Sequence, residues 1–152
     1  DIAIINVHSS GGREMLEAAA KARGEFNDKS TKLIAVTVLT SLDNKDIKEI
    51  GFNDNSEDLV LRLASLAKDS GLDGVVCSAK EISLIKNKFG KNFILVVPGI
   101  RLEEDNKNDQ KRVMSPKKAI DAGADLLVIG RPITDSKDPK KAIDNILKNI
   151  KQ

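Results

Sequence analysis

Two arginines each come shortly after a glycine at the end of an apolar segment, a placement suited to binding an anion. Arg131 directly follows Ile129-Gly130, and Arg101 follows Val97-Pro98-Gly99 by two residues. A glycine lets a phosphate approach backbone N–H groups, and a guanidinium matches phosphate oxygens with a planar, permanently charged fork. A lone Gly-Arg pair is more often a turn beside a solvated charge. Two such arginines at neighbouring strand ends converge on one anion, so they predict a phosphate site.

Further polar residues lie near the ends of apolar segments and have two interpretations each. Thr40 and Ser41 either offer hydroxyls to a ligand or begin the next helix. The amide of Gln110 either donates to a phosphate oxygen and covers a nucleotide, or is solvated. His8 is the only histidine, and we favour a hydrogen-bonded structural role for it over a role as acid, base or ligand.

The remaining candidates are weaker. Cys77 lies within an apolar segment and is expected to be a small buried hydrophobe, while Ser78 is explained by a helix-capping box with Glu81. No zinc spacing, Walker loop, nucleophile elbow or dinucleotide fingerprint occurs. Several acidic residues lack a spacing that fixes a partner, namely Asp43, Asp46, Glu103, Glu104 and Asp105.

The segments that must position these residues alternate between two kinds. Five short runs rich in Val and Ile predict strands buried on both faces of a parallel sheet; they span residues 2–7, 33–39, 74–77, 93–97 and 126–129. Amphipathic or capped segments between them predict helices over 14–23, 57–69, 78–88, from 116 onward, and over 139–151. This alternation predicts an α/β chain with right-handed crossovers. The polar segment 102–113 is either a functional loop or a solvated one.

Composition restricts the function classes. The chain has 152 residues, with 25 Lys and Arg against 23 Asp and Glu, and only 3% aromatic residues. Neither nucleic acid nor an anionic membrane is favoured by that balance, and no apolar run is long enough for a bilayer span. One cysteine and no basic leader predict a soluble, cytoplasmic protein. Because the chain starts at Asp1 without Met, we expect it to be part of a longer protein.

Six ordered motifs give the chain a resemblance to a known family. It resembles orotidine 5'-phosphate decarboxylase of the bacterial type through NVHSSGG at 6–12, AVTVLTS at 35–41, LDGVVCSAKE at 72–81, VVPGIR at 96–101, DQKRVMSP at 109–116 and DLLVIGRPIT at 125–134. The combination of motifs is specific, although no single motif is.

The resemblance implies a (β/α)8 TIM barrel, usually a homodimer, that converts orotidine 5'-phosphate to UMP in pyrimidine biosynthesis without metal or cofactor. It gives Thr40 a hydrogen bond to the pyrimidine or ribose side of the ligand. It gives Arg101, Gln110, Gly130 and Arg131 the task of holding the substrate, chiefly at its 5'-phosphate. These are the strand-end residues that the residue types had already favoured.

The chain also departs from the family. The family carries its catalytic carboxylates and proton-donating lysine at the ends of the first three strands, most visibly as Asp-x-Lys-x-x-x-x-Asp, and that segment does not occur here. The five expected strands then correspond to strands 4 to 8, so residues 1–152 form a single partial barrel domain with no catalytic residue. We expect this chain to bind substrate phosphate and base, to be inactive alone, and to need a complementing N-terminal segment. One alternative is a non-catalytic barrel fragment that binds phosphate or a partner chain. Another is a hexulose-phosphate synthase, which the motifs disfavour.

Overall fold

Five parallel strands form one sheet. The computed structural model of the chain describes residues 2–25, 31–101 and 114–151. Within these residues the strands lie in the sequential order β1-β2-β3-β4-β5, and every neighbouring pair is parallel. Their bounds are β1 (Ile4–His8), β2 (Lys32–Val36), β3 (Gly74–Val76), β4 (Ile94–Val97) and β5 (Leu126–Leu127). All five expected strands are confirmed, with bounds that differ at their ends.

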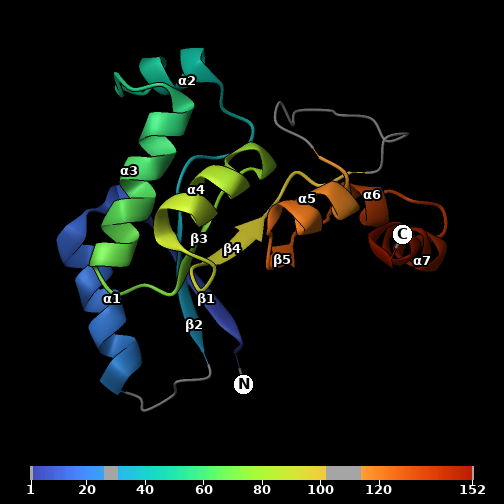
Figure 1. The fold of residues 1–152 in the computed structure, drawn as a ribbon, viewed down its shortest axis with the longest axis horizontal. Helices are drawn as coiled ribbons and strands as arrows, with labels where there is room; N and C mark the ends of the chain where they lie inside the picture. The colour runs from blue at the N-terminus through green and yellow to red at the C-terminus, as the bar shows by residue number, and fades with distance from the viewer. Residues whose placement is uncertain (1, 26–30, 102–113, 152) are drawn as a thin grey trace.

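Helices connect the strands and form a layer against the sheet; in Figure 1, α4 lies in front of the strands and α1 and α3 lie to their left. The helices are α1 (Arg13–Glu25), α2 (Asn44–Glu49), α3 (Ser56–Asp69), α4 (Ile82–Phe89), α5 (Pro116–Ala122), α6 (Arg131–Thr134) and α7 (Pro139–Lys151), with 3-10 turns at Ser9–Gly11 and Ala79–Glu81. No helix among the described residues is long and apolar enough to cross a membrane.

The strand order selects between the two common parallel architectures. In a doubly wound sheet the order reverses at a switch point, whereas in a (β/α)8 barrel each strand pairs with the next one in sequence. The order found here is strictly sequential. The structure is therefore an α/β chain that forms five consecutive strands of a barrel wall.

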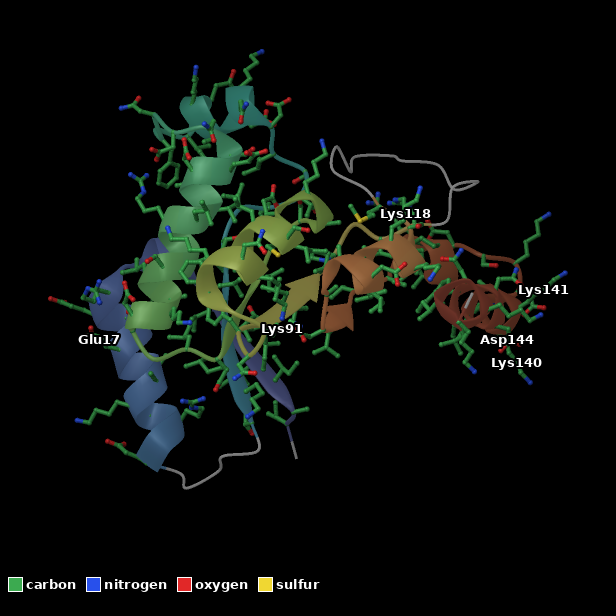
Figure 2. All side chains as sticks on the ribbon, viewed as in Figure 1. Glu17, Lys91, Lys118, Lys140, Lys141 and Asp144 are labelled. Atoms are coloured by element: carbon green, nitrogen blue, oxygen red, sulfur yellow. The ribbon has the colours of Figure 1, made fainter. Side chains whose placement is uncertain are left out.

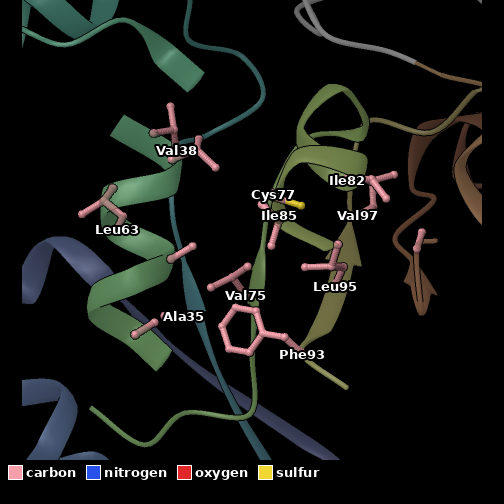
Figure 3. Packing of buried hydrophobic residues seen from close by; sticks show 14 of the residues in the cluster. Ala35, Val38, Leu63, Val75, Cys77, Ile82, Ile85, Phe93, Leu95 and Val97 are labelled. Carbon is pink, nitrogen blue, oxygen red and sulfur yellow. The ribbon is translucent and has the colours of Figure 1, made fainter. Parts of the chain in front are cut away.

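The core fills the space between the sheet and the helices. Ala35, Val75 and Leu95 are aligned across three strands, are each 0% exposed, and point toward the helices. Leu63 of α3 and Ile85 of α4 lie in the same cluster, as Figure 3 shows. Charged side chains of the helices, such as Lys140, Lys141 and Asp144 of α7, project outward (Figure 2).

Burial on both faces holds for the central strands only. Leu33, Ile34 and Ala35 of β2 are all buried. By contrast, Ile5 of β1 is 38% exposed and Leu126 of β5 is 44% exposed, because no described strand covers the outer edge of either. The expectation of two buried faces is therefore wrong for β1 and β5.

Two aspartates, Asp73 and Asp125, make the same hydrogen bonds at the amino ends of two strand pairs. The carboxylate of Asp73 accepts the backbone N–H of Leu33 at 2.8 Å, while the backbone N–H of Asp73 donates to the carbonyl of Leu33 at 2.8 Å. Asp125 makes the same pair of bonds with Leu95, at 2.7 and 3.0 Å. A cation from the helix before the neighbouring strand joins each carboxylate: Arg23 for Asp73, and Lys86, at 2.7 Å, for Asp125. These aspartates therefore fix the sheet at the end opposite to the candidate site.

The helix expected over 78–88 forms as the 3-10 turn Ala79–Glu81 followed by α4, and α7 forms as the sequence predicts. Ser78 accepts from the backbone N–H of Lys80, and the Glu81 carboxylate accepts the N–H of Ser78 at 2.9 Å, which confirms the capping box. Helix α7 has the expected bounds, and Asp138 accepts the N–H of Lys141 at 3.0 Å. Cys77 is fully buried, as expected.

Two helices were not expected. Helix α2 begins after Asp43, whose carboxylate accepts the backbone N–H groups of Lys45 and Asp46 while the Asp46 carboxylate accepts the N–H of Asp43. These two aspartates, candidate acids in the sequence, therefore form a capping box. Helix α6 is a single turn that follows Gly130.

Candidate ligand site at the carboxyl ends of the strands

Three candidate binding residues occupy equivalent places in the sheet. Thr40, Arg101 and Arg131 each lie four residues beyond the last residue of a strand, namely β2, β4 and β5. Val97 and Leu127, from which the two arginines are counted, are paired with each other across β4 and β5. The carboxyl ends of parallel strands meet at one edge, where barrel proteins bind their ligands. The fold thus brings these three residues to the same edge of the sheet.

Arg101 has the most unusual environment. Its side chain belongs to a residue only 7% exposed, and its Nε is buried without a hydrogen-bond partner. Its backbone is fixed, because its N–H donates to the carbonyl of Met114 at 3.1 Å and the preceding Ile100 bridges Met114 in parallel. A guanidinium keeps its charge, and leaving one of its buried N–H groups without a partner is unfavourable. The Nε of Arg101 is therefore available to an anion.

Gly130 and Arg131 form the turn between β5 and α7. Gly130 precedes the single turn of α6 and is exposed, and a Cβ added to it would meet nothing within 4 Å. Arg131 is half-buried at the start of α6, which packs against α7. The space beside Gly130 is open, so a phosphate has room to approach the backbone there.

Thr40 lies at the end of an extension of β2. Thr37 donates its Oγ1 to the carbonyl of Val76 at 2.7 Å, and its backbone N–H reaches the same carbonyl at 3.2 Å. These hydrogen bonds continue the pairing of β2 with β3 beyond Val36, toward Thr40, which is 7% exposed. The alternative that Thr40 begins a helix is wrong, because α2 starts four residues later, at Asn44.

Two further expectations concern Gln110 with its acidic neighbours, and His8. Gln110 and the acidic residues Glu103, Glu104 and Asp105 lie in the segment 102–113, outside the described residues. His8 is exposed at the end of β1 and makes no capping hydrogen bond to the 3-10 turn after it. The structure therefore does not show the hydrogen-bonded structural role that we expected for His8.

A pocket of about 480 Å³ lies elsewhere, between the last turns of α4 and α5. It is at the amino ends of the strands, beside Lys86 and Asp125. The Lys86 ammonium already donates to the carbonyls of Lys91 and Phe93 and to Asp125, at 2.7 to 3.0 Å. We place the candidate site at the carboxyl ends instead, where the buried Nε of Arg101 lacks a hydrogen-bond partner. No cluster of metal-ligating residues occurs in the part of the chain that the structure describes.

A sequential parallel barrel wall with cationic residues at its carboxyl edge defines the class of (β/α)8-barrel proteins that bind ligands at that edge. A family model described as "Orotidine 5'-phosphate decarboxylase / HUMPS family" matches residues 1–146. The chain therefore belongs to the orotidine 5'-phosphate decarboxylase / HUMPS family.

Individual relatives agree with that family. The chain is 55% identical over 149 residues to "Orotidine 5'-phosphate decarboxylase" from Coxiella burnetii and 54% identical over 136 residues to the protein of that name from Marinomonas sp.. Among solved structures, "Crystal structure of Orotidine 5'-phosphate decarboxylase from Lactobacillus acidophilus" has a TM-score of 0.81 and 34% identity.

These matches cover nearly all of this chain but not all of the relatives. The alignments include 97% of this chain and 63% of the Coxiella burnetii protein, 90% and 58% for the Marinomonas protein, and 99% and 64% for the Lactobacillus acidophilus structure. The chain thus spans less than two thirds of the relatives it matches.

Proposed function

We propose that this chain supplies the phosphate- and base-binding part of an orotidine 5'-phosphate decarboxylase, as one partial barrel domain over residues 1–152. The observation that carries the proposal is the buried Arg101 guanidinium at the carboxyl edge of the sheet, whose Nε has no hydrogen-bond partner. Phosphate oxygens form short, charge-assisted hydrogen bonds with a guanidinium. A 5'-phosphate is therefore a suitable counterion for this charge.

The other binding residues follow from their places along the edge. Arg131 lies four residues after β5 and Arg101 four residues after β4, so both serve the phosphate, with Gly130 giving it access to the backbone. Thr40 lies two strands away from β4 in the sheet order and serves the pyrimidine or ribose side. Gln110 completes the phosphate contacts as part of the segment 102–113.

The reaction releases CO2 from C6 of orotidine 5'-phosphate; the electron pair of the broken bond stays on C6, which takes up a proton to give UMP. We assign the lysine that donates this proton, and the carboxylates around it, to a polypeptide part outside these 152 residues. This chain contributes binding energy at the phosphate, far from C6, and such remote binding energy is used to orient and strain the reacting centre. The chain alone is therefore inactive, and the complete protein is a cytoplasmic homodimer.

Calorimetric titration with UMP, and with uridine as the ligand without phosphate, tests the proposal. We expect Arg101→Ala and Arg131→Ala each to raise the Kd for UMP at least tenfold, since a hydrogen bond to a charged group contributes about 1.5–3 kcal/mol. The matched control is Lys91→Ala, which removes the same charge from an exposed residue at the amino end of the sheet. Equal losses in all three variants, or equal binding of UMP and uridine, would contradict the assignment.

The exposed side chains at the sheet edges support a second candidate function. Ile2, Ile5, Leu126 and Val128 are 38% to 64% exposed. Unpaired edges of this kind seek a complement, so a non-catalytic fragment that binds phosphate or a partner chain is the alternative. Binding of UMP without decarboxylation, even when the remaining barrel part is present, would favour this alternative.

A further inference from the structure

Thr37 directly follows β2 and buries a hydroxyl at an otherwise apolar level of the sheet. Side chains alternate along a strand, so Thr37 falls on the same helix-side face as Ala35, two residues before it. The residues at the same level after β3 and at the end of β4 are Cys77 and Val97, both fully buried in the core cluster. Thr37 is 8% exposed. Valine would fill this place without a hydroxyl to desolvate, so packing alone does not explain a threonine here.

The Thr37 hydroxyl holds the chain to β3 after β2 has ended. Its Oγ1 donates to the carbonyl of Val76, the last residue of β3, at 2.7 Å, and its backbone N–H donates to the same oxygen at 3.2 Å. A distance of 3.2 Å is at the long end of the range for N–H···O bonds, whereas 2.7 Å is the usual O–H···O distance. The hydroxyl therefore makes the better of the two bonds.

The chain bends directly after Thr37. Alternation along β2 would turn Val38 away from the helices, yet Val38 is 6% exposed and lies in the core cluster on the helix side (Figure 3). The backbone N–H of Leu42 then donates to the carbonyl of Leu39 at 3.1 Å, which closes a turn around Thr40. The Thr37 hydroxyl therefore anchors the start of the bend on which Thr40 lies.

We propose that Thr37 is a positioning residue for the pyrimidine or ribose side of the ligand, because its hydroxyl bond to Val76 fixes the bend that holds Thr40. This inference rests on the proposed function, which assigns that side of the ligand to Thr40. Thr37 acts through Thr40 and not by touching the ligand. The phosphate residues Arg101 and Arg131 follow β4 and β5, which are two and three strands away from β2, so phosphate affinity is independent of Thr37.

The substitution Thr37→Val tests this role, since it removes the hydroxyl and leaves the backbone N–H to satisfy the Val76 carbonyl. Calorimetric titration of the chain with UMP, and with inorganic phosphate by displacement of UMP, measures the two sides of the site separately. We expect the Kd for UMP to rise about threefold to tenfold, the range of one neutral hydrogen bond, while the Kd for phosphate stays within about twofold. Thr37→Ser keeps a hydroxyl and should bind UMP within about twofold of the wild type.

The matched control is Thr31→Val, before the other end of β2. Thr31 is 9% exposed and its Oγ1 donates to the carbonyl of Ile2 at 2.6 Å, so the control removes a comparable hydroxyl bond at the amino edge of the sheet. Its Kd for UMP should stay within about twofold of the wild type. The double variant with Thr37→Val and Thr40→Val tests the route of the effect. Once Thr40 has lost its hydroxyl, Thr37→Val should change the Kd for UMP by less than about twofold.

Several results would overturn the inference. These are wild-type UMP binding by Thr37→Val, equal losses of UMP and phosphate affinity, a loss as large in Thr37→Ser or Thr31→Val, and additive losses in the double variant. A Thr37→Val chain without a cooperative urea transition would also overturn it, since the hydroxyl would then hold the whole fold and not the bend. All of these outcomes leave the proposed function intact when the wild-type chain binds UMP more tightly than uridine. A wild-type chain that does not bind UMP refutes the proposed function itself.

Discussion

Replacing Asp73 by alanine should destabilise the chain strongly, although the residue is far from the candidate site. The Asp73 carboxylate accepts the N–H of Leu33, which is 1% exposed, and pairs with Arg23. Losing a charged acceptor costs about 1.5–3 kcal/mol, and the N–H of Leu33 is left buried without a partner. The ion pair adds at most about 1 kcal/mol, because both side chains are 24% exposed and partly screened. We therefore expect a loss of about 2–4 kcal/mol for Asp73→Ala.

Urea unfolding followed by circular dichroism measures this loss directly. Asp73→Asn keeps an acceptor for Leu33 but removes the charge, so its expected cost is only about 1 kcal/mol. Asp69→Ala is the control, since Asp69 is exposed at the C-terminal end of α3 and should change the free energy of unfolding by less than about 0.5 kcal/mol. If Asp73→Ala unfolds within 0.5 kcal/mol of the wild type at an unchanged m-value, the fastening role of this carboxylate is refuted.

Three further substitutions test the packing and the site. Gly74→Ala should cost about 3 kcal/mol, because its Cβ would lie 2.1 Å from the carbonyl oxygen of Ile94; an unfolding midpoint like that of the wild type contradicts this. Gly130→Ala should leave the unfolding midpoint unchanged, since its Cβ meets nothing, yet weaken UMP binding in titration by occupying the space for phosphate; unchanged binding counts against that approach. Arg101→Leu should stabilise the ligand-free chain by about 1 kcal/mol in urea while abolishing UMP binding, and a destabilised variant would show that the guanidinium is already satisfied.

Much of the fold follows from local patterns in the sequence. The runs of Val and Ile predicted all five strands, because strands buried between other elements are nearly continuous in apolar residues. The serine of the Ser78–Glu81 box and the Asp138-Pro139 step marked helix starts with side chains that act within a few residues of the chain. Such short-range chemistry is readable without knowing the rest of the structure.

The errors concern features that depend on distant parts of the molecule. Exposure of Ile5 and Leu126 depends on which strand has a neighbour, and an apolar run does not encode that. Helix α2 is not among the expected helices, although the spacing of three residues between Asp43 and Asp46 is the pattern of a capping box. The burial of Arg101 also depends on tertiary packing, so the sequence predicted its anion-binding role without indicating that its Nε would lack a partner.

The central claim is that this chain holds the substrate while another polypeptide part performs the chemistry. Decarboxylation of orotidine 5'-phosphate, followed by the change in absorbance, tests it in three proteins. These are the chain alone, a joined barrel in which this chain is linked to the part of the Coxiella burnetii protein that it does not span, and the joined barrel with Arg131→Ala. We predict no activity for the chain alone, activity for the joined barrel, and a large loss with Arg131→Ala. Activity from the 152 residues alone, or an inactive joined barrel that folds and binds UMP, would contradict the account.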